Sequence, residues 1–124
     1  MKKIILLALC SLVLFPVNAA KRKVHTIGDS TMSDYKPMAT PKRGWGMYLQ
    51  AFFNPDSVEV NNRGKSGAST RTFYETENLW PSVKKEMKPG DYLIIQFAHN
   101  DENEKPERHT EPWTSFMDYL SIFV

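Results

Sequence analysis

The chain has 124 residues, and its 16 Lys and Arg against 14 Asp and Glu give a formal net charge of +2. Two of the lysines, Lys2 and Lys3, precede an apolar segment, and without them 14 cations balance 14 acidic residues. A balanced chain lacks the basic excess that is typical of nucleic-acid binding, so we expect no nucleic-acid partner.

The first 19 residues are typical of a cleaved export signal. The two lysines are followed by an apolar run at 4–15, and Val17 and Ala19 are small residues at the −3 and −1 positions of a cut after Ala19. The apolar run is shorter than the roughly 20 residues that span a bilayer. We therefore expect a secreted or periplasmic protein with no stable membrane association after cleavage. A retained anchor, or a lipid attached to Cys10, is the less favoured alternative.

Three apolar strands alternate with helical segments along the rest of the chain. Strands are expected at 24–27, 58–60 and 92–97, and helices at 47–53, on either side of a break near Trp80, and after Thr110. This β-α-β-α-β-α order favours a parallel sheet with right-handed crossovers. The near-continuous apolar run at 92–97 is typical of a strand that is buried on both faces.

The last helix is expected to begin with Thr110 as its cap and with Pro112 in its first turn. Its apolar residues recur at helical spacing and are expected to pack in the core: Trp113, Phe116, Met117 and Leu120. The chain ends in the apolar residues 122–124, inside this helix. We therefore expect residues 20–124 to be the N-terminal portion of a single domain, with its C-terminal part missing.

Ser30, Gly67 and Asn100 each lie in the loop after one of the three predicted strands. The carboxyl ends of parallel strands share one edge of a sheet, where such folds bind their ligands. Acyl transfer by a serine needs a hydroxyl, a base that takes its proton, and donors for the developing oxyanion. Each of these three residues alone is an ordinary loop residue. Together they predict a serine nucleophile with a backbone N–H and a side-chain amide as oxyanion donors.

Four segments of the sequence resemble the SGNH (GDSL-type) hydrolases, and within them the rhamnogalacturonan acetylesterase branch. They are Gly-Asp-Ser-Thr-Met at 28–32, Gly-Trp-Gly with Tyr-Leu at 44–49, Gly-Ala-Ser-Thr-Arg-Thr-Phe at 67–73, and Pro-Gly-Asp-Tyr through His-Asn-Asp at 89–101. The resemblance covers nearly all of residues 20–124 but only about the N-terminal half of that family's domain. One departure is Ala98, where the family usually has glycine.

This resemblance implies a three-layer α/β/α parallel sheet of flavodoxin-like type. It assigns Ser30 as nucleophile and Gly67 and Asn100 as oxyanion donors, with no metal and no organic cofactor. The implied activity is that of a carboxylic ester hydrolase. It would be an exported serine esterase that removes acetyl groups from a plant cell-wall polysaccharide, with an acetylated pectic chain such as rhamnogalacturonan as its partner. Arg71 and Trp45 are candidate substrate-binding residues, and core packing is an equal alternative for Trp45.

The family takes its base and orienting carboxylate from an Asp-x-x-His motif near the C-terminus. No aspartate stands three places before any of the three histidines of this chain, His25, His99 and His109. We expect His25 to be structural, because it lies within the first strand, and His109 to be solvated. Without a base, Ser30 is a poor nucleophile at neutral pH. The alternative is therefore a truncated, catalytically inactive fragment of such an esterase, with residual carbohydrate binding.

Overall fold

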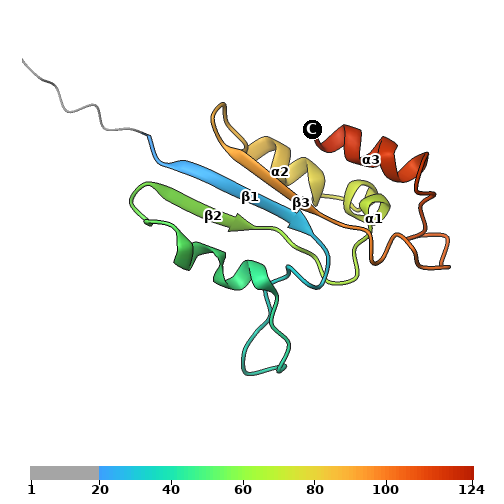
Figure 1. The fold of residues 1–124 in the computed structure, drawn as a ribbon, viewed down its shortest axis with the longest axis horizontal. Helices are drawn as coiled ribbons and strands as arrows, with labels where there is room; N and C mark the ends of the chain where they lie inside the picture. Colours follow the sequence, from blue (N-terminus) through green and yellow to red (C-terminus); the bar gives the residue numbers. More distant parts are fainter. Residues whose placement is uncertain (1–19) are drawn as a thin grey trace, which may run out of the picture.

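A three-stranded parallel sheet runs through the centre of the molecule (Figure 1), with its strands in the order β2-β1-β3. The computed structural model describes residues 20–124, so the export signal expected at 1–19 lies outside the described residues. The strands are β1 (Arg22–Gly28), β2 (Val58–Asn62) and β3 (Tyr92–Gln96). Each predicted strand is confirmed, and β1 lies in the middle, hydrogen-bonded on both sides.

Helical segments flank this sheet. The α-helices α1 (Thr70–Glu75), α2 (Trp80–Glu86) and α3 (Ser115–Phe123) gather on one side, and the 3-10 helix η1 (Trp45–Phe52) lies beside β2 (Figure 1). The segment expected as an α-helix at 47–53 is therefore a 3-10 helix, with no capping side chain at Gly44. Within residues 20–124, no helix has the length and apolar character needed to cross a membrane.

One side chain of η1 protects the outer edge of β2. Gln50 Nε2 donates to the Val58 carbonyl at 3.2 Å, and Gln50 Oε1 accepts from the Val60 N–H at 2.8 Å. These are bonds that a neighbouring strand would otherwise supply. The Gln50 amide thus satisfies the backbone at an edge that would otherwise be open to pairing with other chains.

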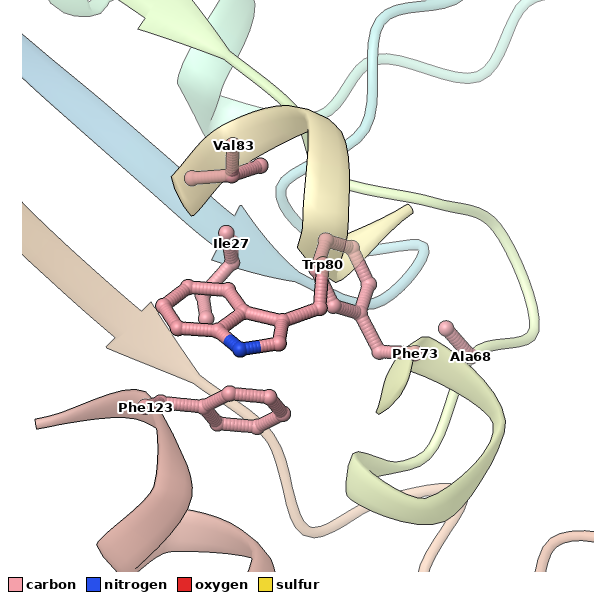
Figure 2. Packing of buried hydrophobic residues seen from close by; sticks show 6 residues of the cluster. All are labelled: Ile27, Ala68, Phe73, Trp80, Val83 and Phe123. Carbon is pink, nitrogen blue, oxygen red and sulfur yellow. The ribbon is translucent and has the colours of Figure 1, made fainter. Parts of the chain in front are cut away.

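The hydrophobic core lies between the sheet and the three α-helices. Ile27 of β1 packs with residues of the loop before α1 and of all three helices, as Figure 2 shows: Ala68, Phe73, Trp80, Val83 and Phe123. The rings of Trp80 and Phe123 meet edge-on with centroids 4.9 Å apart, and those of Phe73 and Phe123 at 6.1 Å. Phe123 therefore fixes α3 against α1 and α2.

The prediction for the last helix was wrong in two respects. The Thr110 hydroxyl does not cap the helix, because it donates to the buried Asp101 carboxylate, and α3 begins only at Ser115. The expected core stripe is also not buried as a unit. Trp113 is 90% exposed and Met117 is 47% exposed, whereas Phe123 is buried. The helix starts later than expected, so Trp113 precedes it.

The strand β3 is covered on one face only. Leu93 and Ile95 pack against the core, but Tyr92 is 64% exposed and Ile94 is also exposed. The expectation that this strand is buried on both faces was therefore wrong for the described residues. On its open face the side chains of Tyr92 and Ile94 border a shallow apolar hollow of about 540 Å³, together with Val24, Phe53 and Val58.

A buried histidine and a carboxylate join the strands away from their carboxyl ends. His25 is fully buried, with Nδ1 3.1 Å from Asn61 Nδ2 and Nε2 3.6 Å from Asp91 Oδ2. Asp91 also accepts from the Lys23 N–H and the Lys88 N–H, each at 2.9 Å. His25 is thus a structural residue, as expected. The backbone hydrogen bond from Lys23 is the main reason that the pKa of Asp91 is lowered.

The substitution Asp91→Asn is expected to weaken the fold and to change its pH dependence. Folding lowers the pKa of Asp91, so the ionised form stabilises the folded state. That stabilisation is present above the ordinary pKa of 3.8 and is lost as the pH falls through the lower folded-state pKa. Urea unfolding should show D91N to be less stable than the wild type at neutral pH, with a smaller further loss in acid.

The exposed Asp56 provides the control, because its side chain has no hydrogen bond within the described part of the chain. D56N should follow the wild-type curve of unfolding free energy against pH. Parallel curves for D91N and the wild type would contradict the role given to Asp91.

Candidate active site

Ser30 lies in a tight turn that a buried carboxylate holds at the end of β1. Asp29 is fully buried, and its Oδ1 accepts from the Thr31 N–H at 2.8 Å. Its Oδ2 accepts from Gln96 Nε2, at the end of β3, at 3.1 Å. The Asp29 carbonyl accepts in addition from the Ser33 N–H at 3.2 Å. Asp29 therefore fixes both the shape of the turn and its position relative to β3.

Tyr35 connects the Ser30 turn with the loop after β2. Its hydroxyl donates to the Ser30 carbonyl at 2.8 Å and lies 3.5 Å from Ser66 Oγ. The Lys65 N–H donates to the Gly28 carbonyl at 2.8 Å, which extends the pairing of the two chain segments beyond the strands. Ser66 is the neighbour of Gly67, so this contact brings the candidate nucleophile to the loop of the first candidate oxyanion donor.

Gly67 and Asn100 are held next to each other. Gly67 has φ of +79°, a conformation that residues with a side chain rarely adopt, and the turn depends on it. Asn100 is buried, and its Nδ2 donates to the carbonyl of Ala68 at 3.0 Å. An amide nitrogen carries two hydrogens. One of them is thus used to orient the Asn100 side chain, and the other has no partner among residues 20–124 and can bind a ligand.

A second buried carboxylate, Asp101, holds the loop after β3 against the start of α1. Its Oδ1 accepts from the Thr70 N–H and from the Thr110 hydroxyl, each at 2.9 Å, and also from the Thr70 hydroxyl. Ser69 caps α1 in a capping box with Thr72. Since Thr70 follows directly, Asp101 fixes the first turn of α1 and hence the loop that carries Gly67.

Comparison with known proteins decides the family. The family described as GDSL-like Lipase/Acylhydrolase matches residues 24–122. The chain belongs to this family. The resemblance of the sequence to GDSL-type hydrolases is thereby confirmed.

Individual members of the GDSL family are similar over most of this chain. Rhamnogalacturonan acetylesterase RhgT of Bacillus subtilis (strain 168) is 42% identical over 102 residues, which are 82% of this chain and 42% of the relative. A rhamnogalacturonan acetylesterase of Emericella nidulans is 36% identical over 95 residues, which are 77% of this chain and 34% of the relative. The chain thus spans less than half the length of the curated relatives it matches.

A solved structure supports the fold. The crystal structure of protein YxiM from Bacillus subtilis superposes with a TM-score of 0.73 at 28% identity, over 84% of this chain and 28% of that chain. The expected α/β class with a parallel sheet is confirmed by this match and by the strand pairing.

Trp45 and Arg71, the candidate substrate-binding residues, each contact β3 or the loop that follows it. Trp45 is 39% exposed and its Nε1 lies 3.4 Å from Gln96 Oε1, so it is not a core residue. Arg71 Nη1 donates to the Pro106 carbonyl at 2.6 Å and so supports the loop after β3. Contact of either side chain with a sugar stays a prediction.

The histidines do not complete the site within the described part of the chain. The Ser30 hydroxyl has no hydrogen-bond partner among residues 20–124. His25 is buried in the sheet, and His99 is exposed. His109 is partly exposed and pairs with Glu111, its Nε2 lying 3.0 Å from Glu111 Oε1, so it is not simply solvated.

Sequence reasoning missed the supporting role of Asp29, Tyr35 and Asp101. The two aspartates are adjacent to Ser30 and Asn100, and a carboxylate beside a candidate site residue at a strand end was the available signal. No comparable signal marks Tyr35, because its partner is a backbone carbonyl five residues away.

Removal of the Asp101 carboxylate is expected to destabilise the protein. In Asp101→Ala the Thr70 N–H loses its acceptor while buried, and such a group costs about 1–3 kcal/mol. Urea unfolding at neutral pH should show at least this loss of unfolding free energy. Asp118→Ala is the control, because Asp118 is exposed on α3. Equal stability of D101A and D118A would contradict the assignment.

Proposed function

We propose that this chain carries the nucleophile and the oxyanion donors of an exported serine acetylesterase. Its substrate would be an acetylated plant cell-wall polysaccharide of the rhamnogalacturonan type. The observation that carries the proposal is the meeting of the Ser30 turn, the Gly67 loop and the Asn100 side chain at one edge of the parallel sheet. The names of the similar RhgT and Emericella nidulans proteins support the substrate class.

The chemistry is transfer of an acetyl group to Ser30 and then to water. Ser30 Oγ attacks the acetyl carbonyl carbon, and its proton passes to a base. The N–H groups of Ser30 and Gly67 and the Asn100 amide stabilise the oxyanion. Collapse of the intermediate breaks the bond to the sugar oxygen, which takes up the proton. Water then attacks the acetyl carbon, the bond to Ser30 Oγ breaks, Oγ takes up a proton that the water gave to the base, and acetate leaves with the remaining proton released to solvent.

A second candidate function is binding of the polysaccharide without turnover. The observation that favours it is that the Ser30 hydroxyl has no hydrogen-bond partner among residues 20–124. The geometry that would stabilise an oxyanion also suits a sugar acetyl group in its ground state, because the same donors can bind the carbonyl oxygen. The two candidates differ only in whether the Ser30 proton has an acceptor.

Acetate release from acetylated rhamnogalacturonan separates the two candidates. The wild type should release acetate, Ser30→Ala should release none above background, and Asn100→Ala should be slower by about 10²–10³-fold, as for other lost oxyanion donors. Ser57→Ala, at an exposed serine in the loop before β2, should match the wild type. Equal and negligible release by the wild type and S30A would reject the esterase and leave the binding function.

Export is tested by the start of the mature chain. Expression with residues 1–19 in a bacterial host should yield a protein outside the cytoplasm that begins at Ala20, as measured by intact mass. A protein that retains Met1 in the cytoplasm would contradict export.

A further inference from the structure

Ser30 opens into a shallow basic hollow, which we name the Ser30 hollow. It has a volume of about 310 Å³ and is lined by Ser30, Thr31, Tyr35, Lys42 and Arg43. Two of the five residues are cations and none is acidic. Beyond the export signal the chain has as many acidic as basic residues, so this positive charge is a local property of the hollow.

The two cations of the hollow have no carboxylate partner among the described residues. Arg43 Nη1 donates to the carbonyls of Thr40 and Lys42, at 2.8 and 2.7 Å, which orients the guanidinium and leaves its charge uncompensated. Elsewhere on the described surface, cations do pair with carboxylates, as Lys23 does with Glu59 at 3.1 Å and Arg63 with Glu86 at 3.1 Å.

The nearby acidic groups are already engaged. Asp29 is buried and accepts from Thr31 and Gln96. Asp34 Oδ1 accepts from Asn62 Nδ2 at 2.7 Å, which turns that carboxylate towards β2. Among the described residues, neither carboxylate forms an ion pair with Lys42 or Arg43, so both cations can bind an anion that enters the hollow.

A third cation, Arg108, lies beside Gly67. A methyl group placed at Gly67 would lie 3.5 Å from Arg108 Nη2, so the Arg108 guanidinium covers this glycine. The site thus has positive charge next to Ser30 and next to Gly67. A carboxylate-bearing ligand fits such a surface, since guanidinium–carboxylate hydrogen bonds are shorter and stronger than neutral ones.

We propose that Lys42 and Arg43 bind a uronic acid carboxylate of the sugar chain whose acetyl group faces Ser30. The inference rests on the proposed function, because it assumes that the acetylated sugar lies at Ser30. It assigns the selection of acidic over neutral acetylated polysaccharides to these two side chains, which act as specificity-determining residues.

Binding of an unacetylated oligogalacturonate tests the proposal. Its control ligand is the same oligosaccharide with its carboxylates methyl-esterified, which removes the charge and keeps the sugar backbone. In calorimetric titrations at low salt, the wild type should bind the free acid more tightly than the ester. The double variant Lys42→Gln, Arg43→Gln should lose about threefold to tenfold in affinity for the free acid, as for exposed ion pairs, and should bind the two ligands alike.

The matched control variant is Lys84→Gln, Lys85→Gln, which removes the same two charges from exposed positions on α2. It should keep the preference of the wild type, and added salt should reduce that preference. Equal affinity of the wild type for both ligands, no measurable binding of the free acid, or an equal loss in the control variant would each overturn the proposal.

The ligand carries no acetyl group, so the result is independent of turnover. Ser30→Ala should keep the preference for the free acid. A preserved preference together with absent acetate release would reject the esterase alone. Acetate release without any preference would reject the uronate-binding role alone.

Discussion

The site depends on two buried carboxylates, Asp29 directly after β1 and Asp101 in the loop that follows β3. Burying a charge is costly unless hydrogen bonds compensate for it. Asp29 accepts from Thr31 and Gln96, and Asp101 Oδ1 accepts from Thr70 and Thr110, whereas the buried Asp101 Oδ2 has no partner among the described residues. Asp29 accepts from the end of β3, and Asp101 accepts from the start of α1. A shift of either loop would break these hydrogen bonds and leave a buried carboxylate without its donors. The positions of Ser30 and Asn100 follow from this constraint.

The core and the site are supported by different faces and ends of the same sheet. Aromatic rings of α1, α2 and α3 pack on one face around Ile27 (Figure 2). The buried pair His25 and Asp91 joins the strands away from the site, and the loops that follow their carboxyl ends carry the candidate catalytic groups. The open face at Tyr92 and Ile94 belongs neither to this core nor to the lining of the Ser30 hollow.

The strands, and the meeting of the loops that follow them, could be predicted because both follow from local pattern. Apolar runs bounded by turn residues locate the strands, and in a parallel sheet the residues after them meet at one edge. The start of α3 could not be predicted in this way. Thr110 is a suitable cap by local rules, but the buried Asp101 competes for its hydroxyl. Likewise, Phe123 rather than Trp113 is buried because α3 contacts Trp80 through Phe123. The spacing of apolar residues along the helix does not predict this contact.

The groups around Ser30 can stabilise negative charge, but they do not provide proton transfer, and the reaction needs both. Positive charge at Lys42, Arg43 and Arg108 and the oxyanion donors favour a negative charge on the substrate, whether a carboxylate or a developing oxyanion. None of these groups accepts the Ser30 proton, because ammonium, guanidinium and N–H groups are hydrogen-bond donors only. A positive field lowers the energy of an alkoxide, but attack still needs a base within hydrogen-bond reach of Oγ. The described part of the chain therefore supplies charge stabilisation and orientation, while proton transfer requires a group outside the contacts that Ser30 makes here.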